Sequence, residues 1–324
     1  MRYLVTGGAG FIGSHYVRSL LAGDLTDDVE RVHVLDKLTY AGNLVNLAAV
    51  SDDARYSFVQ GDICDGDLLD EVIPGHDVVV NFAAETHVDR SIHGPQDFVL
   101  TNVVGTQALL DACLRHEVGR VVHIGTDEVY GSIDVGSWTE DSPLLPNSPY
   151  AASKASAELL ARAYHRTYGL PVSTTRCSNN YGPYQFPEKV IPLFVTNLID
   201  GARVPLYGDG LNVRDWLHVD DHCRGIQIVV ERGEPGAAYN IGGGEELSNR
   251  ELTEIILRHM GTTWDEGVDY VPDRLGHDRR YSVDDSRIRA LGYQPLRDFD
   301  QGIEETIRWY REHPEWWRPL KEAS

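Results

Sequence analysis

A tyrosine and a lysine four positions apart, in the segment YAASK, have the spacing that most directly suggests chemistry. Tyr150 and Lys154 follow Pro149, where a helix is predicted to begin, and residues at i and i+4 share one helix face. A free tyrosine titrates near pH ~10, and an adjacent ammonium group favours its phenolate form. Lowering this pKa by about three units needs roughly 4 kcal/mol of differential interaction. We therefore predict that Tyr150 acts as a general base near neutral pH, assisted by Lys154.

A hydroxyl and two adjacent carboxylates form a second candidate group. Thr126, Asp127 and Glu128 follow directly after an apolar run that is predicted to be a strand. Ligand sites in open parallel sheets lie at the carboxyl ends of the strands. Two like charges in a closed pocket push their pKa values apart, so that one carboxyl stays protonated while the other acts as a base. This segment therefore predicts an acid–base pair in addition to Tyr150.

The segment GGAGFIG, residues 7–13, lies between a predicted strand and a predicted helix. Its glycines fit a tight turn whose backbone approaches a pyrophosphate at a helix N-terminus. Asp36 ends the second predicted strand, where a carboxylate can accept hydrogen bonds from ribose hydroxyls and repel a 2′-phosphate, which favours NAD over NADP. The neighbouring Lys37 partly offsets that charge, and Asp62 with Ile63, after the third strand, could flank the adenine. A bound nicotinamide cation would add to the effect of Lys154 on Tyr150.

Elements that position these groups alternate between apolar strands and amphipathic helices. Near-continuous apolar runs indicate strands that are buried on both faces, as in a parallel sheet. These strands are expected at Tyr3–Thr6, Val32–Asp36, Tyr56–Gln60, Val78–Phe82 and Val121–Gly125. The two longest predicted helices are Pro95–Glu117 and Tyr150–Tyr168. The alternation predicts an α/β fold with a doubly wound parallel sheet of the Rossmann type.

The second half of the chain differs in texture, because glycine and proline cluster and the predicted helices are isolated. These helices are expected at Val190–Ile199, Asp220–Val230, Asn249–Met260 and Gln301–Tyr310. We predict a NAD-binding domain over residues 1–180 and a smaller mixed α/β substrate-binding domain over residues 181–324. The helix at 220–230 could pack back on the first domain.

Composition narrows the possible partners. The chain has 324 residues and a net charge of −21, so neither nucleic acid nor an anionic membrane surface is expected to bind by bulk charge. No apolar run approaches the ~18 residues that span a bilayer, and the N-terminal segment does not resemble a secretory signal. The four cysteines lie far apart, which predicts free thiols and a cytoplasmic protein. His87, His218 and His277 share no ligand spacing, so no metal site is expected.

Taken together, the motifs resemble the extended short-chain dehydrogenase/reductase family, and within it the nucleotide-sugar 4,6-dehydratases. The resemblance runs from end to end and is carried by TGGAGFIGSHYVR, LDKLTYAGN, GDICD, NFAAETHVDRS, TNVVGT, GTDEVYG, YAASKA, RCSNNYGPYQFPEKVIPL, LYGDGLNVRDWLHVDDH, YNIGGG and GHDRRY. Two positions depart from the family pattern. Gly125 stands where the family usually has serine, and Leu275 where it usually has proline. Gly125 is expected to cost one polar contact near the nicotinamide.

This resemblance implies a carbon–oxygen lyase of deoxysugar biosynthesis that converts dTDP-glucose to dTDP-4-keto-6-deoxyglucose and water. In the implied reaction, Tyr150 and Lys154 remove the 4-hydroxyl proton while hydride passes to NAD. Glu128 then removes H5, Asp127 protonates the departing 6-hydroxyl, and hydride returns to C6. Thr126 would donate a hydrogen bond to the 4-oxygen.

Binding residues are implied by the same resemblance. Cofactor contacts are implied at Gly7, Gly10, Phe11, Ile12, Gly13, Asp36, Lys37, Leu38, Thr39, Asp62, Ile63, Ala83, Ala84, Thr101, Tyr150, Lys154 and Asn180. Contacts with the nucleotide sugar are implied at Glu85, Thr86, Thr126, Asn179, Lys189, Val190, Pro205, Tyr207, Arg214, Asn249, Arg274 and His277. A homodimer is also implied, through a four-helix bundle built from the two longest helices; burial of these helices inside the monomer is the alternative reading.

Two other functions share part of this pattern. A nucleotide-sugar 4-epimerase has the glycine turn, Tyr150 and Lys154 but needs no acid–base pair after Thr126. A non-catalytic NAD-sensing protein would keep the glycine turn and lose the tyrosine–lysine pair, which this chain retains. The sequence leaves open the pathway that the product enters and the strictness for thymidine over uridine.

Overall fold

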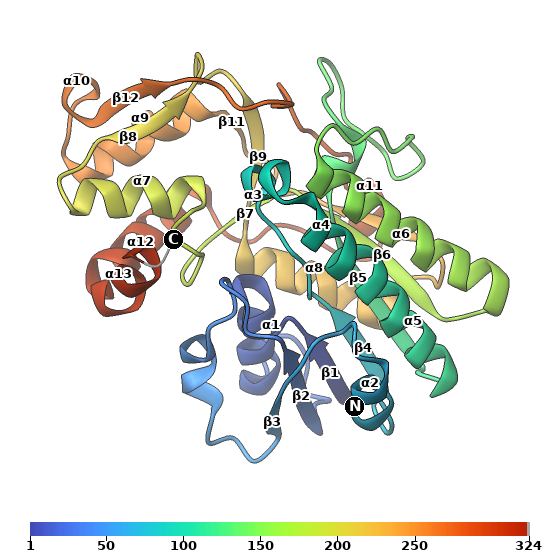
Figure 1. Ribbon diagram of the computed structural model, residues 1–324. Coiled ribbons are helices and arrows are strands. Elements are labelled where there is room, and N and C mark those ends of the chain that lie inside the picture. Colours follow the sequence, from blue (N-terminus) through green and yellow to red (C-terminus); the bar gives the residue numbers. More distant parts are fainter. Residues whose placement is uncertain (323–324) are drawn as a thin grey trace.

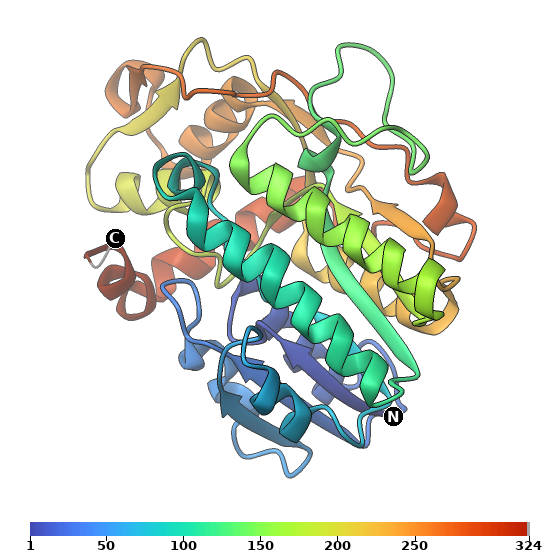
Figure 2. The same cartoon turned by 45° about the vertical axis from the view of Figure 1, so that its right-hand side comes forward.

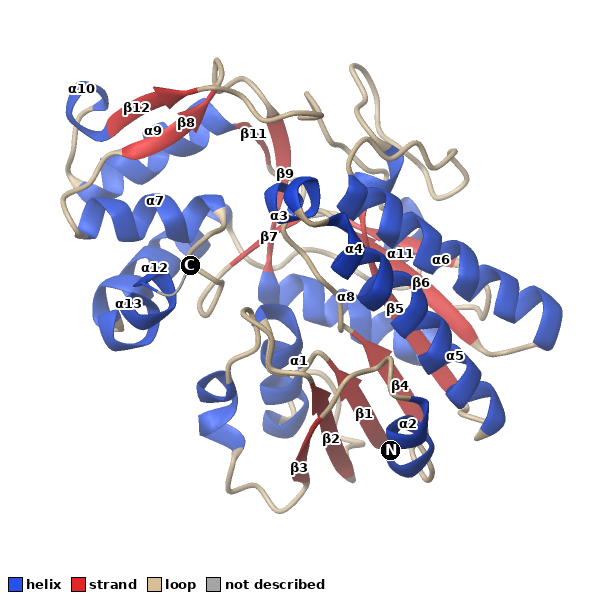
Figure 3. Ribbon diagram, viewed as in Figure 1, coloured by secondary structure: helices blue, strands red, loops and turns tan. Residues whose placement is uncertain are grey.

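A parallel seven-stranded sheet forms the centre of the protein, as shown by a computed structural model that describes residues 1–322 (Figures 1 and 3). Its strand order is β10-β6-β5-β4-β1-β2-β3, and every neighbouring pair is parallel. The strands are β1 (Arg2–Thr6), β2 (Arg31–Asp36), β3 (Tyr56–Gln60), β4 (Val78–Asn81), β5 (Arg120–Thr126), β6 (Val172–Cys177) and β10 (Ala238–Ile241). This topology confirms the predicted Rossmann-type fold.

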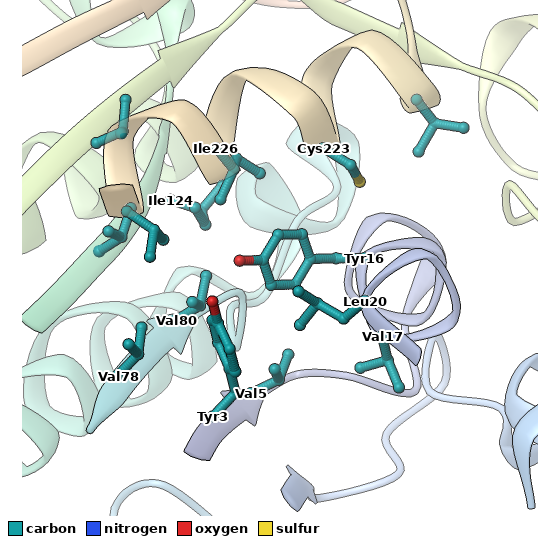
Figure 4. Packing of buried hydrophobic residues seen from close by; sticks show 14 of the residues in the cluster. Tyr3, Val5, Tyr16, Val17, Leu20, Val78, Val80, Ile124, Cys223 and Ile226 are labelled. Atoms are coloured by element: carbon teal, nitrogen blue, oxygen red, sulfur yellow. The ribbon is translucent and has the colours of Figure 1, made fainter. Parts of the chain in front are cut away.

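Helices cover both faces of this sheet, because successive side chains of each strand point to opposite sides. Tyr3 and Val5 of β1 belong to one buried core with residues of α1 (Phe11–Ala22) and α8 (Val219–Arg232), and Figure 4 shows them on the same side of the sheet as Tyr16 and Ile226. Leu4, on the opposite face, belongs to a second core with residues of α2, α5 and α6. The helices of that second layer are α2 (Gly66–Val72), α5 (Thr106–Arg115) and α6 (Pro149–Tyr168). The segments that follow the carboxyl ends of the strands are thus held by packed helices on both faces of the sheet.

The predicted helix at Pro95–Glu117 is not one regular α-helix. It consists of α4 (Pro95–Phe98), a π-helical segment η2 (Val99–Gly105) and α5. In the wider turn, the Asn102 side chain accepts a hydrogen bond from the Glu85 backbone nitrogen (2.8 Å) and donates to its oxygen (3.0 Å) and to Ser153 Oγ (2.9 Å). These contacts join the helix to the loop after β4 and to α6. Apolar periodicity does not register such a local widening, which explains the difference.

The smaller body contains two further sheets. One has the order β11-β9-β7 and the other pairs β12 with β8. Their strands are β7 (Asn179–Tyr181), β8 (Val204–Tyr207), β9 (Val213–His218), β11 (Glu246–Ser248) and β12 (Val268–Val271). The helices of this body are α7 (Val190–Ile199), α9 (Asn249–Met260), α10 (Trp264–Gly267), α12 (Phe299–Glu312) and α13 (Pro314–Glu322). Phe194, Trp216, Ile256 and Trp317 are among its buried core residues.

Three elements beyond residue 180 belong to the larger body. Strand β10 pairs with β6 at the edge of the seven-stranded sheet. Cys223, Ile226 and Val229 of α8 are fully buried in the same core as β1 and α1. The chain therefore leaves the larger body after β6, builds part of the smaller body and returns. Ile288 of α11 (Ser286–Arg289) is fully buried in that core as well. The remaining short elements are η1 (Leu44–Val50), α3 (Val88–His93) and η3 (Asp127–Tyr130).

Among the helices between residues 1 and 322, none combines the length and the apolar character that a bilayer span requires.

Candidate active site

A cavity of about 290 Å³ lies between the two bodies, at the carboxyl ends of the central strands. One wall is formed by the glycine turn and by the segments that follow β2, β4 and β5. The other wall comes from residues 178–189, with Trp316 and Leu320 of α13. The cavity therefore occupies the position at which doubly wound sheets bind ligands.

Helix α6 brings Tyr150 and Lys154 into this cavity. Ser148 caps the helix by accepting a hydrogen bond from the Ala151 backbone nitrogen (3.1 Å), and Pro149 occupies the first turn. Lys154 is buried, and its Nζ donates to the Ile124 carbonyl oxygen at 2.5 Å. Burial lowers the pKa of Lys154 to about 8. The predicted pair is thus in place, with the lysine fixed against β5.

The pKa of Tyr150 differs from the sequence-based expectation. Burial raises it well above the usual value, the charge of Glu128 raises it further, and a hydrogen bond with Thr126 lowers it. The Lys154 ammonium is directed to a backbone oxygen, so it does not supply the expected stabilisation of a phenolate. The side chains alone therefore keep Tyr150 protonated, and additional positive charge in the cavity is needed to make it a base.

Asp127 and Glu128 lie on η3 (Asp127–Tyr130), a short 3₁₀ turn that follows β5. Asp127 is 3% exposed, and its Oδ2 has no hydrogen-bond partner among the described residues. Burial and then the charge of Glu128 raise the pKa of Asp127 well above its usual value. Burial also raises the pKa of Glu128, but Arg274, Arg214 and Lys189 oppose that effect. Asp127 is therefore suited to be the acid, and Glu128 to be the base.

The glycine turn fits a dinucleotide for a steric reason. Gly7 has φ +68°, and a Cβ there would lie 2.5 Å from the Ala83 backbone nitrogen. A Cβ on Gly13 would lie 2.3 Å from the Gly7 carbonyl oxygen. Only glycine allows the backbone to come this close, which leaves the N-terminus of α1 open towards the cavity. The residues present thus match a pyrophosphate cradle.

Asp36 has two roles in this cradle. Its carboxylate lines the cavity and accepts hydrogen bonds from the backbone nitrogens of Ala9 (2.9 Å) and Leu38 (2.8 Å). Burial raises the pKa of Asp36, and these two backbone hydrogen bonds oppose that effect. Lys37 pairs instead with Asp62, with 2.7 Å between Nζ and Oδ2. Because Lys37 has its own partner, Asp36 keeps the negative charge that disfavours a 2′-phosphate.

Most of the predicted site residues do line the cavity. Among the predicted cofactor residues, these are Gly7, Gly10, Phe11, Ile12, Gly13, Asp36, Lys37, Thr39, Asp62, Ile63, Ala83, Ala84, Thr101, Tyr150, Lys154 and Asn180. Among the predicted substrate and acid–base residues, they are Glu85, Thr86, Thr126, Asp127, Glu128, Asn179 and Lys189. Lys189 also donates from Nζ to the Thr86 carbonyl oxygen (3.1 Å), which joins the two walls.

Other predicted residues lie outside this lining. They are Leu38, Val190, Pro205, Tyr207, Arg214, Asn249, Arg274 and His277. Arg214 and Arg274 are still close enough to lower the pKa of Glu128. Arg214 stacks on Tyr281 at 4.2 Å and donates to the Asp278 carbonyl oxygen (2.9 Å), so its side chain is already oriented. The two arginines thus place positive charge outside the cavity lining but within electrostatic range of Glu128.

Several lining residues were not anticipated. They are Leu35, Ala41, Gly42, Asn43, Asn46, Gly61, Phe82, Ile124, Cys177, Ser178, Tyr184, Gln185, Phe186, Glu188, Trp316 and Leu320. The dense glycine, proline and aromatic segment YGPYQFPEK was a usable signal for Tyr184 to Glu188. Trp316 had none, because it reaches the cavity through a hydrogen bond from Nε1 to Asn46 Oδ1 (2.8 Å) across the fold.

Gly125 has a structural explanation. A Cβ at this position would lie 2.5 Å from the carbonyl oxygen of Thr175 on the neighbouring strand. The side chain that the resemblance leads one to expect here therefore does not fit the spacing between β5 and β6. Leu275 is 78% exposed, and the structure assigns it no contact that explains the departure.

Comparison with known proteins identifies the family to which the chain belongs. A family model described as GDP-mannose 4,6 dehydratase matches residues 4–306. A curated relative, the dTDP-glucose 4,6-dehydratase of Streptomyces niveus, is 60% identical over 99% of this chain and 96% of its own. The chain belongs to the dTDP-glucose 4,6-dehydratase family.

Solved structures agree with this assignment to the dehydratase family. The crystal structure of DesIV, a dTDP-glucose 4,6-dehydratase from Streptomyces venezuelae with NAD and TYD bound, has a TM-score of 0.97 and 63% identity, covering 99% of this chain and 100% of that chain. A UDP-glucose 4-epimerase from Thermotoga maritima, solved with UDP-glucose, has a TM-score of 0.88 and 30% identity, covering 97% of this chain and 100% of that one. The fold is thus shared with epimerases, whereas the sequence is much closer to the dehydratases.

Proposed function

We propose that this protein converts dTDP-glucose to dTDP-4-keto-6-deoxyglucose and water, with NAD as its resident cofactor. It is a carbon–oxygen lyase of deoxysugar biosynthesis, as its family membership indicates. The observation that carries the proposal is the Asp127–Glu128 pair, which lines the same cavity as Tyr150 and Lys154. Burial and the charge of Glu128 raise the pKa of Asp127, whereas nearby cations counteract the effect of burial on the pKa of Glu128. Oxidation alone needs no such pair, whereas elimination of water needs both an acid and a base.

NAD is proposed to lie along the glycine turn and Asp36, with its nicotinamide end towards Tyr150 and Lys154. When bound, it supplies the oxidation of C4 and returns the same hydride at C6. Its positive ring also adds the charge that the pKa of Tyr150 requires. The cofactor is restored in each turnover, so a closed cradle that retains it is chemically sufficient.

The side chains then act in sequence on the sugar. Tyr150 takes the proton of the 4-hydroxyl while Thr126 donates a hydrogen bond to that oxygen. The resulting 4-keto group acidifies H5, which Glu128 removes. Asp127, held protonated by burial, gives its proton to the departing 6-hydroxyl, so that water leaves. Hydride then returns to C6, and C5 takes back the proton that Glu128 removed. The proton that Tyr150 took from the 4-hydroxyl replaces the one that Asp127 gave to water, so that all three side chains return to their starting states.

The nucleotide is proposed to bind along the positive wall. Lys189, Arg214 and Arg274 all lower the pKa of Glu128, so all three cations lie within electrostatic range of this carboxylate. Charge-assisted hydrogen bonds from arginine suit a diphosphate. We also propose contacts from Val190, Pro205, Tyr207, Asn249 and His277, on the strength of the family resemblance. The preference for thymidine rests on the relatives and is tested by comparing the kinetics on dTDP-glucose and UDP-glucose.

The mechanism is tested by replacing the acid and the base together. In Asp127→Asn combined with Glu128→Gln, C4 should still be oxidised, so reduced nicotinamide should accumulate while water loss collapses. Absorbance of the reduced nicotinamide follows the first step, and the alkali-induced absorbance of the 4-keto product follows the second. Asp141→Asn is the control, because this side chain is 85% exposed and pairs with Arg287 at the surface. Wild-type elimination by the double variant would refute the assigned roles.

The same assays separate the alternative functions. A 4-epimerase would give no 4-keto product and would release the galactose epimer. An NAD-sensing protein would bind NAD and turn over no nucleotide sugar. Formation of the 4-keto product by the wild-type protein excludes both.

We further propose a homodimer through a four-helix bundle. The α4–η2–α5 run and α6 lie side by side on the outside of the larger body in both views (Figures 1 and 2). Their exposed apolar side chains are Val99, Leu100, Val104, Leu159 and Tyr168. Such a face favours a second copy of the same helices. Sedimentation of Leu100→Glu is the test: it should shift the protein to monomer, and an unchanged mass would contradict the interface.

The division into domains and the cellular location are also proposals. We propose that residues 1–180 form most of the NAD-binding domain and residues 181–324 most of the sugar-binding domain, with α8 and β10 assigned to the former by their packing.

We propose a cytoplasmic location because all four cysteines are free thiols. Cell fractionation tests the location.

A further inference from the structure

A buried polar cluster behind the cavity joins the two segments that carry the catalytic groups. Its centre is Arg176 on β6, which is 5% exposed. The guanidinium donates from Nε to both oxygens of Glu158 (3.0 and 2.9 Å) and from Nη1 to the Glu140 carbonyl oxygen (3.1 Å). Nη1 also donates to the hydroxyl of Tyr130. Arg176 does not line the cavity, so the proposed reaction does not use it directly.

One branch of the cluster leads to the helix that carries Tyr150. Tyr150, Lys154 and Glu158 follow one another at intervals of four residues on α6, so they lie along one helix face. Glu158 is buried and holds that face against β6 through Arg176. Its charge also raises the pKa of Lys154, in opposition to burial. The Glu158–Arg176 ion pair therefore affects the position of the helix that carries Tyr150 and the pKa of Lys154.

The other branch leads to the turn that carries the acid and the base. Tyr130 ends η3, the turn that begins with Asp127 and Glu128. Its hydroxyl donates to Asn240 Oδ1 (2.8 Å), and its ring lies 4.7 Å from the Arg176 guanidinium and is stacked on Trp138. The turn is thus fastened at its last residue by a side chain that Arg176 contacts.

A need for stability alone does not explain such a cluster, because apolar residues of similar volume often stabilise a core as well as a buried ion pair does. What a guanidinium adds is fixed geometry, since its donors lie in one plane at set angles. Resting on the proposed function, we propose that Arg176 is a positioning residue that holds the Asp127–Glu128 turn in register with the Tyr150–Lys154 helix. Elimination can then follow oxidation without movement of the sugar.

Tyr130→Phe tests the branch to the turn. The variant keeps the ring and its stacking and removes the hydroxyl that Arg176 contacts. Water loss should slow by about tenfold, the effect of about one hydrogen bond, while the initial oxidation rate stays unchanged. Reduced nicotinamide should therefore accumulate during a single turnover.

Glu158→Gln tests the branch to the helix and should give the opposite result. Oxidation should slow more than elimination, because Lys154 loses both its support and a neighbouring negative charge. Arg176→Lys keeps the positive charge but loses the planar set of donors, so both steps should slow together. This pattern of separate losses is not expected from a cluster that only stabilises the fold.

Tyr239→Phe is the matched control. Tyr239 precedes Asn240 on β10, but its side chain points to the opposite face of the sheet, into the core of α1 and α8, where its hydroxyl accepts a hydrogen bond from the Glu234 backbone nitrogen (2.8 Å) and contacts neither branch. In this control the ratio of the oxidation rate to the rate of water loss should stay at the wild-type value, even if the melting temperature falls. The proposal is overturned if Tyr130→Phe and Glu158→Gln change both steps equally or behave like this control. Failure of the proposed function would appear differently, as absence of the 4-keto product from the wild-type protein.

Discussion

The two walls of the cavity are built in different ways. The wall proposed to hold the cofactor, here called the cofactor wall, comes from neighbouring strand ends of one sheet, and its main feature, the glycine turn, occupies residues 7–13. The wall proposed to hold the sugar nucleotide, here called the sugar wall, combines residues 178–189 with Trp316 and Leu320 of α13. Arg214 and Arg274 lie outside its lining and lower the pKa of Glu128. Backbone geometry dominates the first wall, whereas the second is made of side chains from segments that lie far apart in the sequence. A local turn is recognised from its own residues, whereas a composite wall requires the whole fold.

Where the walls meet, Tyr150 should matter most. Tyr150→Phe removes the proposed base and should lower the initial oxidation rate by roughly 10²–10⁴-fold. The rate is measured by the appearance of reduced nicotinamide in a single turnover. Tyr168→Phe, on the same helix and 59% exposed, should leave it unchanged. An undiminished oxidation rate in Tyr150→Phe would remove this residue from the mechanism.

A methyl group on the cofactor wall should have the next largest effect. In Gly13→Ala the new Cβ would lie 2.3 Å from the Gly7 carbonyl oxygen, so the backbone must shift. Overpacking of this kind costs about 1–3 kcal/mol, and the NAD dissociation constant should rise by about tenfold to a hundredfold. Gly66→Ala is the control, since nothing lies within 4 Å of a Cβ there. Calorimetric titration with NAD measures both variants; equal affinities would show that the turn tolerates a side chain.

On the sugar wall, Arg214→Lys should affect substrate and not cofactor. The lysine keeps the charge but loses the planar donors, so the KM for dTDP-glucose should rise by about tenfold. NAD affinity should stay at the wild-type level. Arg203→Lys, an exposed ion pair with Asp269 in the same body, serves as the control. A parallel loss of NAD affinity in Arg214→Lys would erase the distinction between the two walls.

The smallest effect is expected for Lys37→Met, at the edge of the cofactor wall. Lys37 is 54% exposed and pairs with Asp62, and exposed ion pairs contribute about 0–1 kcal/mol. NAD affinity should therefore change by no more than about fivefold. Titration at low and high salt measures it. A larger loss would mean that Lys37 binds the cofactor itself, and that side-chain charge also matters on this wall.

Local patterns were sufficient for much of the fold. The bounds predicted for Val190–Ile199 and Asn249–Met260 coincide with α7 and α9. The ends of α9 carry clear helix signals, namely the Ser248–Glu251 capping box and the left-handed Gly261 that follows the helix. The strands of the larger sheet were found because they are buried on both faces and are therefore continuously apolar. The glycine turn and the tyrosine–lysine spacing likewise depend on neighbours in the sequence.

Long-range properties were not predictable in this way. The π-helical segment depends on Asn102 meeting the loop after β4, and Trp316 reaches the cavity from α13. The raised pKa of Tyr150 depends on burial and on where Lys154 points, neither of which spacing reveals. Each of these depends on pairs of residues that only the folded chain brings together.

The excursion of the chain between β6 and α8 also constrains how such enzymes can be recombined. A chimera made by a single splice after residue 180 would discard edge strand β10 and helix α8, leaving β6 unpaired on one side and the core around Tyr3 open. An exchange of sugar-recognition modules would instead need grafted segments that spare residues 219–241 and 286–293, because the core of the acceptor scaffold includes side chains from both stretches.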